Sequence, residues 1–176
     1  MLSRGELTPD GEHATLIFRR RYPHGIDQVW AAISTPEGLE GWLMAKVATI
    51  EGRVGGRIEL VSGPPQYHSI GQVLAWDPPR LFEYEWNVAP VPEMPRGERA
   101  IFRFELTADG DGTALRVTYR RLTRSTATGF LPGLHAFLDR LEAQLAGQPL
   151  PDWQERFLAR GAEYPQWRGH ADHGGG

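Results

Sequence analysis

The chain has 176 residues, a formal net charge of −3 and no cysteine. The lack of cysteine excludes a thiol nucleophile, a redox-active disulfide and a zinc–thiolate site. The slightly acidic charge, with arginines scattered along the chain, argues against a nucleic-acid partner, because phosphate binding requires a basic surface.

The two ends of the chain differ in composition from the part between them. Residues 1–12 and 168–176 are polar and contain glycine, and we expect both to be flexible tails. The first residues lack the apolar stretch of a signal peptide, and no window approaches the roughly 18 apolar residues of a membrane span. We therefore expect a cytoplasmic protein of one domain that makes no membrane contact.

The first predicted elements are a strand and two short helices. Residues 14–22 predict the strand, and apolar residues at helical spacing predict a helix from 26 to about 32. Thr35 is suited to cap a second helix, and Pro36 fits its first position because an N–H there would have no partner. This helix should end near Trp42.

A run of strands follows. Apolar and polar residues alternate in six segments, namely 46–51, 57–61, 69–76, 80–87, 99–107 and 113–122. The breaks between them are rich in glycine and proline, as in Asp77-Pro78-Pro79 and Asp109-Gly110-Asp111-Gly112. Gly52–Gly56 is also predicted to be a turn, because it lacks the lysine of a phosphate-binding loop. Sequential strands with short turns predict an antiparallel meander.

One long amphipathic helix comes after the strands. Leucine and phenylalanine side chains trace one face from Leu134 to Leu145, with Pro132 near the first turn and Gly147 just past the end. A further helix is predicted around residues 152–160. Its apolar side has to be buried on its own domain, over a cavity or on a partner.

The order of these elements predicts an α+β fold. An antiparallel sheet with one apolar face has to cover that face, and the long helix is the element large enough to do so. We therefore expect a curved, antiparallel, seven-stranded sheet wrapped on a long C-terminal helix. The space between them is either filled by side chains or left as a cavity.

An ordered set of short motifs resembles a known family. The motifs are Ile26–Trp30, Thr35–Leu39, Gly55-Gly56, Gly71–Val73, Asp77–Leu81, Gly112–Leu115 and Leu138–Gly147. Together they are similar to bacterial proteins that resemble the C-terminal domain of the activator of the chaperone Hsp90. That family belongs to the START-like, helix-grip superfamily, also called SRPBCC. The resemblance implies a domain over residues 13–147. Residues 148–167 extend beyond the usual end of the family and are predicted to form a helical extension.

The resemblance also implies a function. The superfamily places a strand, two helices, six strands and a C-terminal helix around a deep apolar cavity, and uses this cavity for lipids, polyketides and other hydrophobic molecules. A chaperone partner and a role in the stress response follow from the family label alone. Tyr119 stands where many relatives have histidine, which argues against histidine-dependent chemistry at that position.

Three large rings share one face of a predicted strand, because Phe82, Tyr84 and Trp86 alternate with Glu83 and Glu85. The glutamates indicate a solvent-facing side. The rings either fill the core or border a cavity. Buried tyrosine and tryptophan carry polar groups that need partners, which favours a cavity beside at least Tyr84 and Trp86.

Ten residues are predicted to bind a ligand in this cavity. They are Trp30, Trp42, Tyr67, Tyr84, Trp86, Phe102, Phe104, Tyr119, Leu134 and Leu138. Trp30 and Trp42 should lie at the mouth of the cavity. The hydroxyls of Tyr67, Tyr84 and Tyr119 are suited to bind a ligand oxygen.

The case for catalysis depends on His135. It lies at the flank of the apolar stripe of the long helix, where it either stays in solvent or reaches the cavity entrance. At the entrance a neutral imidazole could orient a ligand or act as a general base. The sequence has no nucleophile motif, no histidine pair with metal spacing and no cofactor motif. We therefore expect no metal and no cofactor.

Three functions remain open from the sequence. The leading hypothesis is a carrier or sensor that binds a small hydrophobic molecule in the cavity. The second is a cyclase- or hydrolase-type enzyme that uses the same cavity with His135 or a tyrosine. The third is an interaction module for a chaperone or for a homodimer, through an apolar patch of Phe130, Trp153, Phe157 and Trp167.

Overall fold

One open antiparallel sheet is the central feature of the fold. The structure, a computed structural model, describes residues 4–165 of the chain. Its elements are β1 (Glu6–Asp10), β2 (His13–Tyr22), α1 (Ile26–Ser34), α2 (Pro36–Trp42), β3 (Val47–Ile50), β4 (Arg57–Ser62), β5 (Tyr67–Asp77), β6 (Leu81–Val88), β7 (Glu98–Asp109), β8 (Gly112–Thr123), α3 (Arg124–Leu145) and α4 (Trp153–Gly161). The eight strands follow the order β1-β2-β8-β7-β6-β5-β4-β3.

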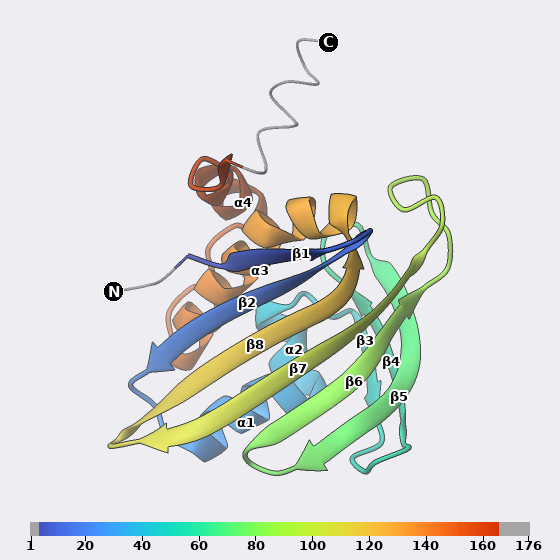
Figure 1. The fold of residues 1–176 in the computed structure, drawn as a ribbon. Helices are drawn as coiled ribbons and strands as arrows, with labels where there is room; N and C mark the ends of the chain where they lie inside the picture. Colours follow the sequence, from blue (N-terminus) through green and yellow to red (C-terminus); the bar gives the residue numbers. More distant parts are fainter. Residues whose placement is uncertain (1–3, 166–176) are drawn as a thin grey trace.

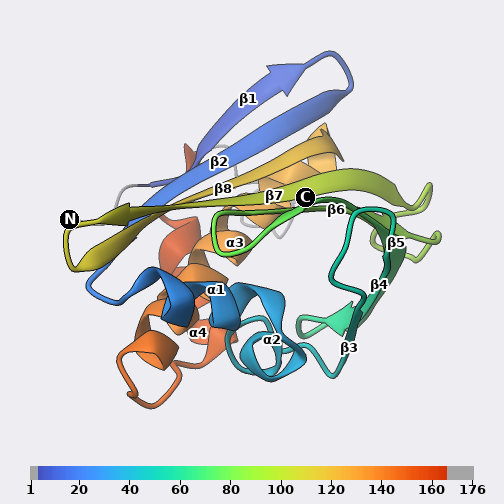
Figure 2. The same cartoon turned by 90° about the horizontal axis from the view of Figure 1, so that it is seen from below.

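The helices lie on one side of the sheet. Figure 1 shows strands of the sheet in front of α3, and Figure 2 shows the four helices beneath the curved sheet. The long helix α3 lies along the concave side. The predicted α+β, helix-grip architecture is confirmed.

The sheet has one strand more than the predicted seven. The expectation of a flexible tail at residues 1–12 is wrong for Glu6–Asp10, which pair with β2 as the edge strand β1. Pro9 is tolerated at an edge, and Leu7 packs against the core. Pairing with β2 orders a segment whose own composition is polar. The tail expected at 168–176 lies outside the described residues.

Local signals place the two short helices correctly. Thr35 caps α2, because its Oγ1 accepts a hydrogen bond from Gly38 N at 3.0 Å, and Pro36 is the first residue of that helix. α1 continues to Ser34, slightly further than predicted. These helices join β2 to β3 on the concave side of the sheet.

Helix α3 begins at Arg124, directly after β8. Pro132 therefore lies inside the helix, which corrects the prediction that it stands near the first turn. Burial of Leu131, Pro132 and Gly133 outweighs the low helix propensity of proline and glycine. Gly147 has a φ of 69° and ends the helix as predicted. No helix within residues 4–165 combines the length and apolarity needed to cross a bilayer.

The two faces of the sheet differ as the alternating pattern predicts. The rings of β6 point toward the helices and are buried. Glu83 lies on the outer face, 3.2 Å from Arg103 and 3.3 Å from Arg120. The turns at 78–80 and 110–111 connect β5 to β6 and β7 to β8, at the predicted turn motifs.

Candidate functional site

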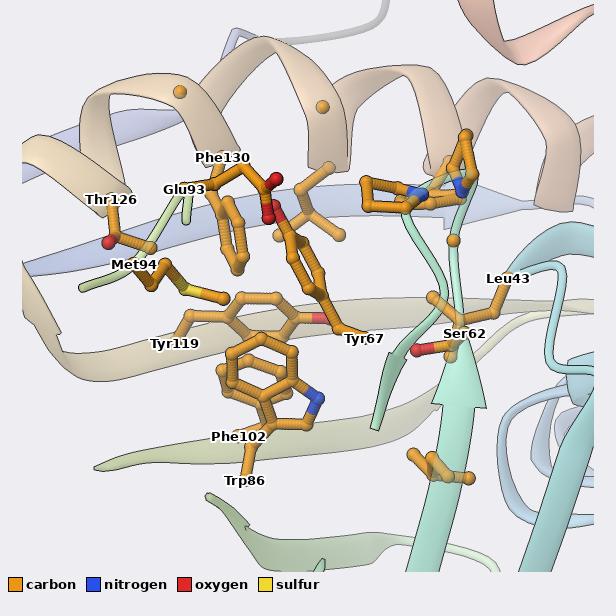
Figure 3. A pocket seen from close by; sticks show the side chains of 18 of the residues that line it. Leu43, Ser62, Tyr67, Trp86, Glu93, Met94, Phe102, Tyr119, Thr126 and Phe130 are labelled. Atoms are coloured by element: carbon orange, nitrogen blue, oxygen red, sulfur yellow. The ribbon is translucent and has the colours of Figure 1, made fainter. Parts of the chain in front are cut away.

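A cavity of about 390 Å³ lies between the concave face of the sheet and the first half of α3 (Figure 3). Its lining residues come from strands (Leu60, Ser62, Tyr67, Tyr84, Trp86, Phe102, Tyr119), loops (Leu43, Gly63, Pro64, Pro65, Glu93, Met94), α3 (Ser125, Thr126, Gly129, Phe130, Gly133, Leu134, Phe137) and α4 (Trp153, Phe157). Most of these side chains are apolar or aromatic, as is typical of small-molecule sites.

Rings from three neighbouring strands form the floor of the cavity. Tyr84, Phe102 and Tyr119 stand opposite one another across β6, β7 and β8. Phe102 and Tyr119 stack with their centroids 3.5 Å apart, and Trp86 stacks on Phe102 at 5.0 Å. The small Ala100 is the cross-strand partner of Trp86, which leaves room for the indole to lean over Phe102.

Two tyrosine hydroxyl groups belong to this floor. Tyr84 and Tyr119 are 3% and 4% exposed, and neither hydroxyl forms a hydrogen bond with a residue that the structure describes. Burial raises the pKa of both phenols well above the ordinary value, and Tyr84 raises the pKa of Tyr119 further. Both groups therefore stay protonated and can donate hydrogen bonds.

The indole of Trp86 provides a third donor. In Trp42 and Trp153 the ring N–H donates to a backbone carbonyl, at 2.8 Å and 3.2 Å. The ring N–H of Trp86 has no such acceptor within residues 4–165. The floor of the cavity is thus rich in donors that the protein itself leaves unused.

Tyr67, Phe130 and Glu93 form the rim of the cavity (Figure 3). The two rings are partly exposed, with centroids 6.3 Å apart, and both contact Trp86. Glu93 is exposed, and the pKa of Tyr67 is raised by burial and then by the Glu93 carboxylate. Glu93 is the one charged side chain among the lining residues, and it lies at the rim.

Two glycines of α3 leave space in the cavity wall. A Cβ atom at Gly129 would meet no atom within 4 Å, and one at Gly133 would lie 3.5 Å from Trp153. Glycine in a helix interior costs about 1 kcal/mol relative to alanine. Gly129 therefore lowers the stability of the helix but leaves this part of the cavity unfilled.

Helix α4 supplies the outer part of the wall. Trp153 stacks on Phe157 at 4.7 Å and contacts Phe137 of α3 at 5.4 Å. These contacts partly bury Trp153 and Phe157 of the C-terminal extension on its own domain, beside the cavity, whereas Leu158 is exposed. Of the residues predicted to form an exposed interaction patch, Phe130, Trp153 and Phe157 are partly buried and line the cavity, whereas Trp167 lies outside the described residues.

A buried carboxylate fixes α4 to α3. Asp139 accepts hydrogen bonds from Arg156 at 2.9 Å and from Arg160 at 2.8 Å. Burial alone would raise the pKa of Asp139, but the hydrogen bonds from the two arginines outweigh it, and the pKa is lowered. The carboxylate stays charged and holds α4 against the cavity wall.

Six of the predicted ligand-binding residues line the cavity, namely Tyr67, Tyr84, Trp86, Phe102, Tyr119 and Leu134. Trp30, Trp42, Phe104 and Leu138 do not line it. Trp42 is fully buried and packs on Phe104 at 6.5 Å, and Trp30 packs on Trp76 at 5.2 Å. The prediction that Trp30 and Trp42 lie at the mouth is therefore wrong, because both pack in the core.

His135 does not line the cavity, which corrects the prediction of a general base there. Its ring packs on Phe18 of β2 at 5.7 Å, and its Nδ1 is 2.6 Å from the Tyr164 hydroxyl. Burial, followed by Arg160 and Arg20, lowers the pKa of His135 to about 4. The helical wheel is misleading here because α3 is buried on more than one side, so the flank of its apolar stripe faces β2.

Sequence reasoning missed the lining residues that lie in loops. Pro64 and Pro65 follow β4, and Glu93 and Met94 lie between β6 and β7. Such loops have no periodicity from which a buried face could be predicted. The apolar Met94 inside a proline-rich segment is the one available signal, and it is 4% exposed. Within residues 4–165 no cluster of His, Asp or Glu side chains could hold a metal ion.

Comparisons with known proteins agree with this geometry. The sequence model described as "Activator of Hsp90 ATPase homolog 1-like protein" matches residues 23–146. A search of curated proteins found no match.

Solved structures share the fold over most of the chain. CalU16 of Micromonospora echinospora is 24% identical with a TM-score of 0.69, and the match covers 93% of this chain and 94% of that one. Protein MLL2253 of Mesorhizobium loti is 28% identical with a TM-score of 0.67, covering 77% and 99%. The BPP1335 protein of Bordetella parapertussis is 24% identical with a TM-score of 0.68, covering 94% and 91%.

Proposed function

Because the chain belongs to the family of activator of Hsp90 ATPase homolog 1-like proteins, we propose that it binds one small, mostly apolar molecule in the cavity between the sheet and α3. The observation that carries this proposal is the cavity itself, about 390 Å³ of space bordered by stacked rings. Small-molecule sites typically occupy roughly 300–1,000 Å³. Ordinary protein interiors hold few voids larger than a water molecule.

The walls suit an apolar ligand. Leu43, Leu60 and Leu134 are buried beside the rings, and Met94 lines the cavity from the loop between β6 and β7. Each Å² of apolar surface removed from water contributes about 25 cal/mol to binding before the cost of association. The flexible methionine side chain can adapt to the shape of a ligand.

The lining residues favour binding over proton-transfer catalysis. None of them is His, Lys or Arg, and their one carboxylate, Glu93, is exposed at the rim. His135 lies outside the cavity. We therefore propose a carrier or sensor rather than a cyclase- or hydrolase-type enzyme. A chaperone partner and a homodimer stay predictions.

Filling the cavity should abolish binding of an apolar probe. In Gly129→Phe a ring would enter the space in which a Cβ atom meets no neighbour within 4 Å. We expect the neutral fluorescent probe N-phenyl-1-naphthylamine to saturate the full-length wild type at one molecule per chain. Fluorescence titration should show binding to Gly129→Phe that is at least about tenfold weaker, or about 1.4 kcal/mol.

Gly129→Ala is the matched control, because it replaces the same glycine with one added carbon. It should bind the probe like the wild type and raise the free energy of unfolding by about 0.5–1 kcal/mol through helix propensity. Equal probe affinity in Gly129→Phe and Gly129→Ala, or no saturable binding to the wild type, would contradict the proposed function.

A further inference from the structure

The cavity contains hydrogen-bond donors whose protons have no acceptor in the protein. The hydroxyls of Tyr84 and Tyr119 and the ring N–H of Trp86 belong to lining residues that are at most 4% exposed. None of the three groups bonds to another described residue. A ligand that fills the cavity without accepting these protons would leave the donors unsatisfied, which is unfavourable. A ligand that accepts them therefore gains an advantage over one that does not.

The two tyrosines lie in one row of the cavity floor. They stand in the same cross-strand row on β6 and β8, on either side of Phe102, and both line the cavity. A carbonyl oxygen has two lone pairs and can accept from both hydroxyls.

The distribution of charge disfavours an anionic ligand. Apart from tyrosines, Glu93 is the one ionisable residue among the lining residues, and it is exposed at the rim. A carboxylate would have to pass Glu93 and would find no cation inside. Burying an unpaired charge is much more costly than burying a neutral group that is hydrogen-bonded.

Stacking among the rings disfavours a cationic ligand. An ammonium group binds over an open ring face, within about 6 Å of the centroid. Phe102 has Tyr119 stacked on it at 3.5 Å and Trp86 at 5.0 Å. The face of Phe102 is thus covered by other rings and offers a cation no open site.

We infer that the ligand is a neutral, mostly apolar molecule with a carbonyl oxygen, and that this oxygen accepts hydrogen bonds from the Tyr84 and Tyr119 hydroxyls. A ligand hydroxyl fits less well, because it brings a proton that needs an acceptor of its own. Trp86 offers a further donor beside the same floor. The inference rests on the proposed function, since it names the chemical class of the ligand in that cavity.

Two naphthalenes of similar shape separate the effect of the carbonyl from that of the apolar body. 2-Acetylnaphthalene carries the carbonyl, and 2-isopropylnaphthalene has an isopropyl group in its place. Displacement of N-phenyl-1-naphthylamine gives the dissociation constant of each for the full-length wild type, Tyr84→Phe and Tyr119→Phe. Comparing variant with wild type for one ligand at a time cancels the different hydration of the two ligands.

Each substitution should weaken binding of the ketone by a factor of about 3–10, the range of a net hydrogen bond. The affinity for the hydrocarbon should not fall, and it should rise where the hydrocarbon leaves the wild-type hydroxyl without an acceptor. Tyr22→Phe is the matched control, because its hydroxyl is buried and without a partner among the described residues but does not line the cavity. Both affinities of that variant should match the wild type. Thermal unfolding checks that the variants, which lose an unbonded hydroxyl, keep their fold.

Different outcomes contradict different claims. Equal effects of Tyr84→Phe and Tyr119→Phe on ketone and hydrocarbon would overturn the inference, because the tyrosines would then act as walls. If 2-naphthoate bound more tightly than the ketone, the ligand would be an anion and the inference would be wrong. If trimethyl(2-naphthyl)ammonium bound more tightly than the ketone, the ligand would be a cation and the inference would be wrong as well. Failure of every probe to bind the wild type would instead contradict the proposed function, and the inference with it.

Discussion

His135 joins α3 to the segment after α4 through its hydrogen bond with Tyr164. It is 1% exposed, and its Nε2 has no partner among the residues that the structure describes. Burial first, and then Arg160 and Arg20, lower its pKa to about 4. An unfolded histidine has a pKa of about 6.5. Between these two values the unfolded chain binds more protons than the folded one.

The free energy of unfolding should therefore fall as the pH falls from about 6.5 towards 4. The contribution of neutral His135 is fully present above the unfolded pKa and is lost as the pH falls through this window. Between pH 7.5 and pH 5.0 we expect it to lower the free energy of unfolding by about 2 kcal/mol. In His135→Asn the decrease in the free energy of unfolding between these two pH values should be smaller by about 2 kcal/mol. Urea unfolding at both pH values tests this, and the same drop in both proteins would refute it.

Helices and strands whose signals are local could be predicted from the sequence. Alternating residues mark β3 to β8, and Thr35 caps α2 as its position before Pro36 suggests. Elements that form only through contacts with another part of the chain could not be predicted from the sequence. Glu6–Asp10 form a strand because β2 pairs with them, and residues 124–133 are helical because the domain buries part of them. In both cases tertiary contacts outweigh an unfavourable local sequence.

Removing the charge of Asp139 should loosen α4. Asp139 is 7% exposed and holds Arg156 and Arg160. Asp139→Asn would leave both arginines without this carboxylate, so we expect the free energy of unfolding to fall by about 2 kcal/mol. Limited trypsin digestion should also cut faster after the two arginines.

Glu155→Gln is the control for this test, because Glu155 is an exposed acidic residue of the same helix. It should change the free energy of unfolding by less than about 0.5 kcal/mol. Wild-type stability and an unchanged digestion pattern in Asp139→Asn would show that the ion pair does not hold α4 in place.

In the whole molecule the helices lie beneath the curved sheet (Figure 2). The sheet and α3 form two walls of the cavity. Residues on strands could be assigned to a wall because a strand has two faces, and Glu83 beside Tyr84 identifies the inner one. Residues on helices are harder to assign, because the packing angle decides which turn meets the cavity. Leu134 lines it as predicted, whereas Trp42 and His135 are buried elsewhere.

The indole N–H signals of the tryptophans test most directly whether a ligand binds in this cavity. Trp86 and Trp153 line it, whereas Trp30, Trp42 and Trp76 do not. When ¹⁵N-labelled full-length protein is titrated with 2-acetylnaphthalene, we predict that the signals of Trp86 and Trp153 shift saturably in ¹H–¹⁵N NMR spectra. The signals of Trp30, Trp42 and Trp76 should stay in place. Shifts of Trp30 and Trp76 without Trp86, or no shift of any indole, would contradict binding in the cavity.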